Sequence, residues 1–181
     1  MLYTLVVNPA VQVRALSRSA IQDIYQGRIT NWSQVGGPDV PITVIQPPAN
    51  DTIGTIFRAF VLNGHAEHVK GTRPKKDWLQ TVALTPGAIS YAPLMAVQDA
   101  NVTVLAIDGV PPTAQTLVQG TYAFWSVEHL YTQSNGSSQL QSYLPFLISG
   151  PEASIFFSYG AVPINLVPQN VQATHLPGPE I

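Results

Sequence analysis

Hydrophobic and polar positions alternate along this chain at two different periods. Short apolar runs rich in β-branched residues and bounded by turn residues predict buried strands. These runs cover residues 2–7, 42–45, 88–92 and 102–107. Apolar residues spaced three and four apart predict helices between and after the strands, at 18–26, 53–62, 77–84, 94–97, 112–119, 137–148 and 151–159. Such alternation of strands and helices predicts an α/β fold with a mostly parallel sheet.

The ends of the predicted elements carry recognisable signals. Ser17 precedes the first helical pattern and is expected to be its N-cap, and Gly27 is expected to end it. The segment 122–132 is predicted to be extended. The tail from 169 to 181 contains amides and prolines and is expected to fray.

The loop between the second strand and the following helix, residues 46–55, offers the clearest binding chemistry. A helix that begins after a strand end presents backbone N–H groups and the positive end of its dipole. Hydroxyls of Thr52 and Thr55 lie beside that start, so the loop could seat an anion or another polar ligand. On spacing alone, however, the preferred interpretation is a simple helix cap by Asp51 or Thr52.

Composition narrows the function classes. The chain has 181 residues, no cysteine, a net charge of −2 and only 10% charged residues. Cysteine chemistry is therefore excluded, and no basic field argues for a nucleic-acid partner. The sequence also lacks a phosphate-binding P-loop, a Gly-x-Gly-x-x-Gly motif and a Gly-x-Ser-x-Gly elbow, and we expect neither an enzyme nor a cofactor.

Two charged or metal-ligating clusters remain to be weighed. His65 and His68 are three residues apart without a third ligand nearby, which is typical of a solvated helix end rather than a zinc site. Lys70, Arg73, Lys75 and Lys76 are half of all basic residues. Their clustering is typical of an exposed loop, and recruitment of an anionic partner is the alternative.

Several blocks of the sequence resemble the phosphate-binding proteins of bacterial ABC transporters. The most specific is LSRSAIQDIYQGRITNW at 16–32, followed by VGGP at 35–38. Further blocks follow in the family's order: TPGAISY at 85–91, IDGVPPT at 107–113, GTY at 120–122, FLISGPE at 146–152 and YGAVP at 159–163. The resemblance extends from about Val6 to Pro163.

This resemblance implies a fold of two α/β lobes joined by two crossing segments, with the anion held between the lobes. Residues 4–124 are expected to form the whole second lobe, and residues 125–181 the segment that returns to the first lobe. The opening part of the first lobe and a signal segment are expected to be absent from this chain. An extracytoplasmic location, in the periplasm or on the outer face of the membrane, is implied.

The resemblance also implies where the ligand binds. The family has an arginine shortly before a Ser-Gly-Thr at the helix start. Without a gap, Asp51-Thr52-Ile53 falls on that tripeptide and Pro47 on the arginine; with a two-residue insertion, Ile53-Gly54-Thr55 falls there instead. The candidate ligand-binding residues are therefore Asn50, Asp51, Thr52, Ile53, Gly54 and Thr55.

In both alignments the arginine is absent. Arg58 lies further along the helix and the basic loop is distant in sequence, so we expect no residue to replace it.

Two functions are consistent with these features. The first is an extracytoplasmic solute-binding protein that binds phosphate or a similar small anion by lobe closure. Its partners would be the missing first-lobe segment and an ABC-transporter permease. The alternative is a degenerate member of the family, a sensing or protein-interaction domain without phosphate binding, in which an exposed apolar surface would favour association with a partner or with itself.

Overall fold

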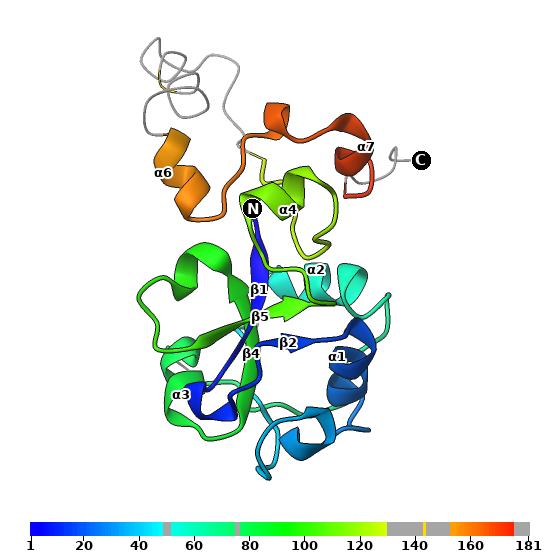
Figure 1. Ribbon diagram of the computed structural model, residues 1–181, viewed down its shortest axis with the longest axis vertical. Coiled ribbons are helices and arrows are strands. Elements are labelled where there is room, and N and C mark those ends of the chain that lie inside the picture. Colours follow the sequence, from blue (N-terminus) through cyan, green and yellow to red (C-terminus); the bar gives the residue numbers. More distant parts are fainter. Residues whose placement is uncertain (49–51, 75–76, 130–142, 144–152, 176–181) are drawn as a thin grey trace.

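A computed structural model describes residues 1–48, 52–74, 77–129, 143 and 153–175 of the chain (Figure 1). Its centre is a five-stranded sheet in the order β2-β5-β1-β4-β3. The strands are β1 (Tyr3–Val7), β2 (Ala15–Leu16), β3 (Thr43–Val44), β4 (Ala88–Pro93) and β5 (Thr103–Ile107). The α-helices are α1 (Arg18–Tyr25), α2 (Ile53–Phe60), α3 (Trp78–Leu84), α4 (Ala114–Val118), α6 (Ala153–Ser158) and α7 (Gln169–Gln172). Short 3₁₀ helices are η1 (Pro9–Val11), η2 (Trp32–Val35), η3 (Leu94–Val97) and η4 (Ile164–Leu166).

The sheet is mixed, which corrects the expectation of a mostly parallel one. Strand β2 runs parallel to β5 and β3 runs parallel to β4, but β1 lies between β4 and β5 and is antiparallel to both. Strand–helix alternation is informative about β2 and β3, each of which is followed by a helix. Strand–helix alternation does not predict the direction of β1, which is the N-terminal strand and lies in the middle of the sheet. The α/β class itself is confirmed.

Strand β1 divides the core into two hydrophobic clusters, one on each face of the sheet. Because successive side chains of a strand point to opposite faces, Leu5 and Val7 contribute to the larger cluster and Val6 to the smaller one. The larger cluster also contains the apolar faces of α1 and α2, and the smaller one contains Val82 of α3. All five residues of β1 are buried.

The ends predicted for the first helix are confirmed. The side chain of Ser17 accepts a hydrogen bond from the amide of Ala20 as the N-cap of α1, and Gly27 has a φ of 76° after its end. The predicted helix at 137–148 lies outside the described residues apart from Tyr143. The one predicted at 151–159 corresponds to α6 in its described part.

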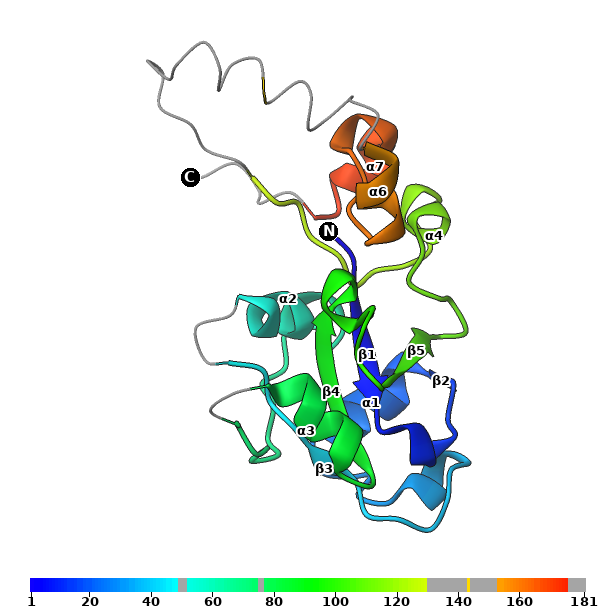
Figure 2. The same ribbon diagram turned by 90° about the vertical axis from the view of Figure 1, so that its left-hand side faces the viewer.

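Figures 1 and 2 show two tiers, with the sheet below and α4, α6 and α7 above. The N-terminus lies between the tiers, because β1 rises out of the sheet towards the upper one. Backbone bonds hold this crossing: the amide of Leu2 donates to the carbonyl of Gly160, and that of Tyr3 to Phe124. Among the residues that the structure describes, no helix has the length and hydrophobicity needed to cross a membrane.

The start of the tail is ordered, in contrast to the expectation that it frays from residue 169. Residues 169–172 form α7, and the His175 ring lies between the rings of Phe60 and Trp125, with centroid distances of 3.9 Å to each. A ring nitrogen of His175 lies 2.8 Å from the carbonyl oxygen of Ala123. The amides and prolines predicted fraying, but stacking of one imidazole on two aromatic rings offsets the lost chain entropy.

This stacking makes the docked tail sensitive to pH. Burial lowers the pKa of His175 below its ordinary value, although the Ala123 carbonyl opposes the shift. The unfolded chain therefore binds a proton at a higher pH than the folded chain does. The contribution of His175 to the free energy of unfolding is fully present above about pH 6.5 and decreases as the pH drops below it.

We expect the free energy of unfolding, measured in urea, to decrease from pH 7.5 to pH 5 by more in the wild type than in His175→Phe, which keeps an aromatic ring without a titrating group. His65→Phe alters an exposed histidine and should leave the wild-type pH dependence intact. Equal pH dependence in the wild type and His175→Phe would contradict this prediction.

Candidate functional site

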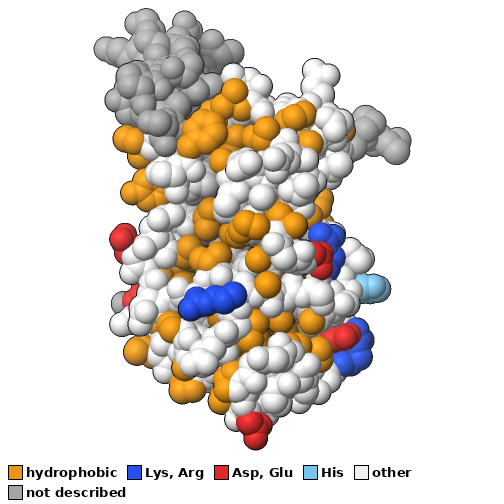
Figure 3. Space-filling model, in the orientation of Figure 1, with side chains coloured by type: hydrophobic (Ala, Val, Ile, Leu, Met, Phe, Trp, Pro, Cys, Tyr) orange, Lys and Arg blue, Asp and Glu red, His pale blue; other side chains and the backbone are white. Residues whose placement is uncertain are grey.

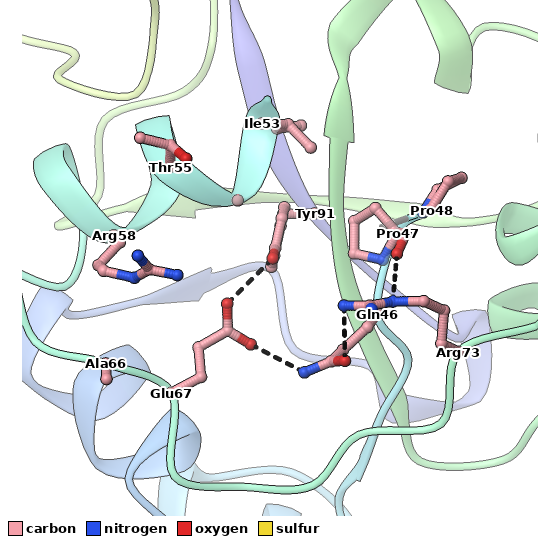
Figure 4. Close-up of a pocket in the computed structure, with 11 residues that line it drawn as sticks. Gln46, Pro47, Pro48, Ile53, Thr55, Arg58, Ala66, Glu67, Arg73 and Tyr91 are labelled. Atoms are coloured by element: carbon pink, nitrogen blue, oxygen red, sulfur yellow. Dashed lines mark hydrogen bonds between the residues drawn. The ribbon is translucent and has the colours of Figure 1, made fainter. Parts of the chain in front are cut away.

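A cavity of about 310 Å³ opens at the N-terminus of α2 (Figure 4). Its wall is formed by the start of that helix, the chain that leaves β3, the segment that follows α2, and one side chain of β4. The lining residues are Gln46, Pro47, Pro48, Ile53, Gly54, Thr55, Arg58, Ala66, Glu67, Arg73 and Tyr91. Three of the residues predicted from the sequence, Ile53, Gly54 and Thr55, are among them.

The other predicted residues stand differently. Thr52 is the exposed N-cap residue of α2, does not line the cavity and makes no side-chain capping bond. Its carbonyl accepts hydrogen bonds from the amides of Thr55 and Ile56, at 2.9 and 3.3 Å. The Thr55 amide is therefore already used within the first turn, and the Thr55 hydroxyl is the group that this residue offers. Asn50 and Asp51 lie outside the described residues.

Two arginines line the cavity, which corrects the expectation that no residue replaces the missing arginine. Arg58 lies one turn after Gly54 on α2. Arg73, from the basic loop, donates from Nε to the carbonyl of Pro47 and from Nη2 to Oε1 of Gln46, each at 3.0 Å. Its guanidinium therefore adjoins Pro47, the residue that aligns with the family's arginine.

Pairing between distant segments brings Arg73 to this place. The amide of Thr72 donates to Val44 and the amide of Gln46 donates to Thr72, so residue 72 continues the sheet beside β3. A side chain at Gly71 would place its Cβ 2.9 Å from the Val44 carbonyl oxygen, which is closer than such atoms approach. The basic segment can therefore lie against β3 because residue 71 is glycine.

Arg58 had a local signal that sequence reasoning did not use, because residues 54 and 58 are four apart and share a helix face. Arg73 had no local signal, since its position depends on the pairing of Thr72 with Ile45. Glu67 and Tyr91 were missed for the same reason: neither is close in sequence to the helix start.

A carboxylate and a phenol complete the cavity. The Tyr91 hydroxyl donates to Oε1 of Glu67 at 3.0 Å, and Nε2 of Gln46 lies 3.4 Å from Oε2 of the same carboxylate. Burial, followed by the charge of Glu67, raises the pKa of Tyr91, so its hydroxyl stays protonated and remains a donor at neutral pH. The Tyr91 ring is held by stacking on Phe57, with a centroid distance of 4.2 Å.

The charges in the cavity are arranged around this carboxylate. Figure 4 shows Arg58 on the α2 side, Arg73 on the opposite side, and Glu67 and Tyr91 between them. Two guanidinium groups and the positive end of a helix dipole outweigh one carboxylate. The cavity therefore suits a small anion, particularly one that also carries a proton for the carboxylate to accept.

The described part of the chain offers no group of three histidine, cysteine, aspartate or glutamate residues that could hold a metal ion. His65 and His68 are both exposed in the segment after α2.

Comparison with known proteins agrees with this description. The family model described as PBP superfamily domain matches residues 2–151. The chain is 33% identical over 161 residues to the phosphate-binding protein PstS of Bacillus subtilis, covering 87% of this chain and 53% of that protein. It is 22% identical over 129 residues to the phosphate-binding protein PstS of Borreliella burgdorferi, covering 65% of this chain and 46% of that one. The chain thus spans about half the length of these curated relatives.

Solved structures share the fold. One is a substrate-binding protein of a putative phosphate ABC transporter from Clostridium perfringens with bound phosphate, with a TM-score of 0.72 and 23% identity over 90% of this chain and 68% of that one. Another is an ABC-type phosphate transport receptor from Vibrio cholerae, with a TM-score of 0.65 and 22% identity over 89% of this chain and 68% of that one. The resemblance read from the sequence motifs is confirmed.

The bond between Tyr91 and Glu67 can be tested without a ligand. Tyr91→Phe keeps the stacked ring but removes the donor to a carboxylate, and should lower the free energy of unfolding by about 1–2 kcal/mol. Denaturant unfolding at pH 7 measures this. Tyr159→Phe, at a tyrosine that is 41% exposed, is the matched control and should change stability by less than about 0.5 kcal/mol. A Tyr91→Phe variant as stable as the wild type would show that the bond contributes nothing.

Proposed function

The chain belongs to the PBP superfamily, and from this we propose that it binds phosphate or a similar small anion as an extracytoplasmic solute-binding component of an ABC transporter. The observation that carries the proposal is the convergence of Arg58, Arg73 and the N-terminus of α2 on one cavity. Guanidinium groups supply planar, permanently charged donors that match the oxygens of a phosphate. The phosphate-binding relatives named above support the same ligand class.

Arg73 is already positioned for this role. Its bonds to Pro47 and Gln46 hold the guanidinium at the cavity wall, so less side-chain freedom is lost when an anion binds. An arginine has five N–H donors and two of them make these bonds, which leaves others for a ligand. Among the predicted residues, the Thr55 hydroxyl and the first turn around Gly54 would contact the anion from the other side.

Glu67 would select which anion binds. A carboxylate beside an anion is unfavourable unless the ligand donates a proton to it. Hydrogen phosphate carries such a proton at neutral pH, whereas sulfate does not. A site built to accept a ligand O–H discriminates against an analogue that lacks it. We therefore expect phosphate to be preferred over sulfate.

Binding would involve closure rather than chemistry. In this proposal residues 4–124 are one lobe of a two-lobe clamp, and residues 125–181 belong to the part that returns towards the other lobe. The cavity would be half of the complete site, with the remaining contacts supplied by a first-lobe segment. Closure over the anion would create the surface that a transporter permease recognises.

The alternative function is a sensing or interaction domain that has kept the fold without binding phosphate. One observation favours it: large hydrophobic side chains of the C-terminal segment, including Ile155 and Leu166, are about half exposed. Calorimetry distinguishes the two functions, because the alternative predicts no heat on titration with phosphate.

The role of Arg73 is tested by titrating the chain with sodium phosphate in a calorimeter. Arg73→Gln should weaken binding about tenfold or more, since a hydrogen-bonded charge pair is worth roughly 1.5–3 kcal/mol. Arg28→Gln removes the same charge from an exposed ion pair with Asp23 outside the cavity and should bind as the wild type does. The proposal would be contradicted if the wild type released no heat on titration with phosphate. It would also be contradicted if Arg73→Gln and Arg28→Gln weakened phosphate binding equally.

The role of Glu67 is tested by comparing phosphate with sulfate. Glu67→Gln replaces a carboxylate by an amide that can donate to a fully deprotonated anion, so the ratio of phosphate affinity to sulfate affinity should fall about tenfold or more. Titration of each anion, followed by the fluorescence of a reporter attached to the chain, measures the two affinities and their ratio. An unchanged ratio would show that Glu67 does not determine which anion is preferred.

A further inference from the structure

The cavity at α2 holds opposite charges that do not pair with each other. Elsewhere in the described part of the chain, Arg18 pairs with Asp108 and Arg28 with Asp23. Each of these pairs includes a residue of α1, and Figure 3 shows blue and red side chains adjoining each other in that region. A guanidinium and a carboxylate that line one cavity attract each other and match in geometry. The separation of the cavity's charges therefore needs a physical cause.

The side-chain amide of Gln46 lies between Arg73 and Glu67. Its Oε1 accepts a hydrogen bond from Nη2 of Arg73 at 3.0 Å, and its Nε2 lies 3.4 Å from Oε2 of Glu67 (Figure 4). The charges dictate this orientation of the amide, because a guanidinium only donates and an ionised carboxylate only accepts. An amide has one group of each kind, so it satisfies both charges without letting them touch.

Backbone pairing holds Gln46 in this position. Its amide nitrogen donates to the carbonyl of Thr72 at 2.8 Å, so the residue lies beside the segment that leads into Arg73. Arg73 has a second bond, from Nε to a backbone carbonyl, and Glu67 accepts a second bond from the hydroxyl of Tyr91 on its other oxygen. Each charge is therefore held by two contacts, and Gln46 is the contact that they share.

We propose that Gln46 is a positioning residue that keeps Arg73 and Glu67 from forming a direct ion pair, and so keeps both available to an anion. A direct pair would use guanidinium donors and carboxylate oxygens together, and an incoming anion would have to break it. The amide uses one N–H of the guanidinium and one acceptor site of the carboxylate, so further donors and acceptor sites remain for a ligand. The purpose of this arrangement rests on the proposed anion binding, but the separation of the charges can be measured without a ligand.

The ligand-free test is a double-mutant cycle of Arg73→Gln and Glu67→Gln, measured by urea unfolding of the full chain at pH 7. The cycle gives the coupling between the two charged side chains as a ratio of unfolding constants. It is run with Gln46 present and again with Gln46→Met, which keeps a side chain of similar length and removes both hydrogen-bonding atoms. We expect the coupling to be about tenfold larger with Gln46→Met, because a direct charge-assisted contact then forms. Gln46→Ala should increase it in the same direction, and it replaces Gln46→Met if that variant does not unfold cooperatively.

Gln22→Met is the matched control. Nε2 of Gln22 donates to the carbonyl of Val61 at 3.0 Å, and the residue does not line the cavity. The same chemical change at this position should leave the coupling at its wild-type value. A coupling that the Gln46 variants do not increase, or that Gln22→Met increases as much, would overturn the proposal whether or not the chain binds phosphate.

Calorimetric titration with sodium phosphate adds a functional measurement. Gln46→Met should weaken phosphate binding about tenfold in the wild-type background. In Glu67→Gln it should weaken binding by less than about threefold, because no carboxylate remains to capture the guanidinium. Equal weakening in both backgrounds would contradict the role of Gln46 as a separator of charges. A wild type that releases no heat with phosphate would contradict the proposed function instead, and the ligand-free cycle would then decide the role of Gln46.

Discussion

The position of β1 in the centre of the sheet is the constraint on which the other parts of the structure depend. This strand pairs with β4 on one side and β5 on the other, and its alternating side chains supply both core clusters. Its register sets Leu5 opposite Tyr91, which lines the cavity. Its first residue, Tyr3, bonds to Phe124, and Leu2 just before it bonds to Gly160 in the upper tier. A single buried strand thus joins the sheet, the cavity and the C-terminal segment, and its loss would separate all three.

A group of packed aromatic rings connects the sheet to the start of α2. Phe57 of α2 stacks on Tyr91 and meets the ring of Tyr25 of α1 edge-on, at centroid distances of 4.2 and 4.8 Å. Phe124 packs against both Phe57 and Tyr91. These contacts are hydrophobic and geometrically specific, so they fix the axis of α2 against the strand that holds Tyr91. Phe57 lies between Thr55 and Arg58 in the sequence, and its burial in the core holds the helix that carries both of these residues.

Local sequence signals account for much of this fold but for less of the cavity. The Ser17 cap, the helix from Ile53 and the strands around residues 5, 90 and 105 follow from periodicity and end signals. The orientation of β1 and the docking of His175 do not follow from such local signals. The first depends on contacts between residues more than 80 positions apart, and the second on contacts between residues more than 40 positions apart. The start of α2 was predictable as part of the cavity, because Ile53, Gly54 and Thr55 are consecutive in the sequence at the first turn of the predicted helix. Arg73 and Glu67 were not, since only tertiary pairing brings them to it.

Arg73 reaches the cavity from a different segment than an arginine in the loop before α2 would, and this affects how the charges of the cavity are held. An arginine in the loop before a helix would be carried by the same backbone that supplies the helix amides. Here the guanidinium comes from a segment after α2 and is held by the Pro47 carbonyl and the Gln46 amide oxygen. Gln46 also contacts Glu67, so cation and carboxylate are tied to one side chain. The positive and negative groups of the cavity are therefore coupled: a movement of the basic segment alters the surroundings of the carboxylate as well. Gly71 allows that segment to lie against β3, so a residue that does not line the cavity helps to position Arg73.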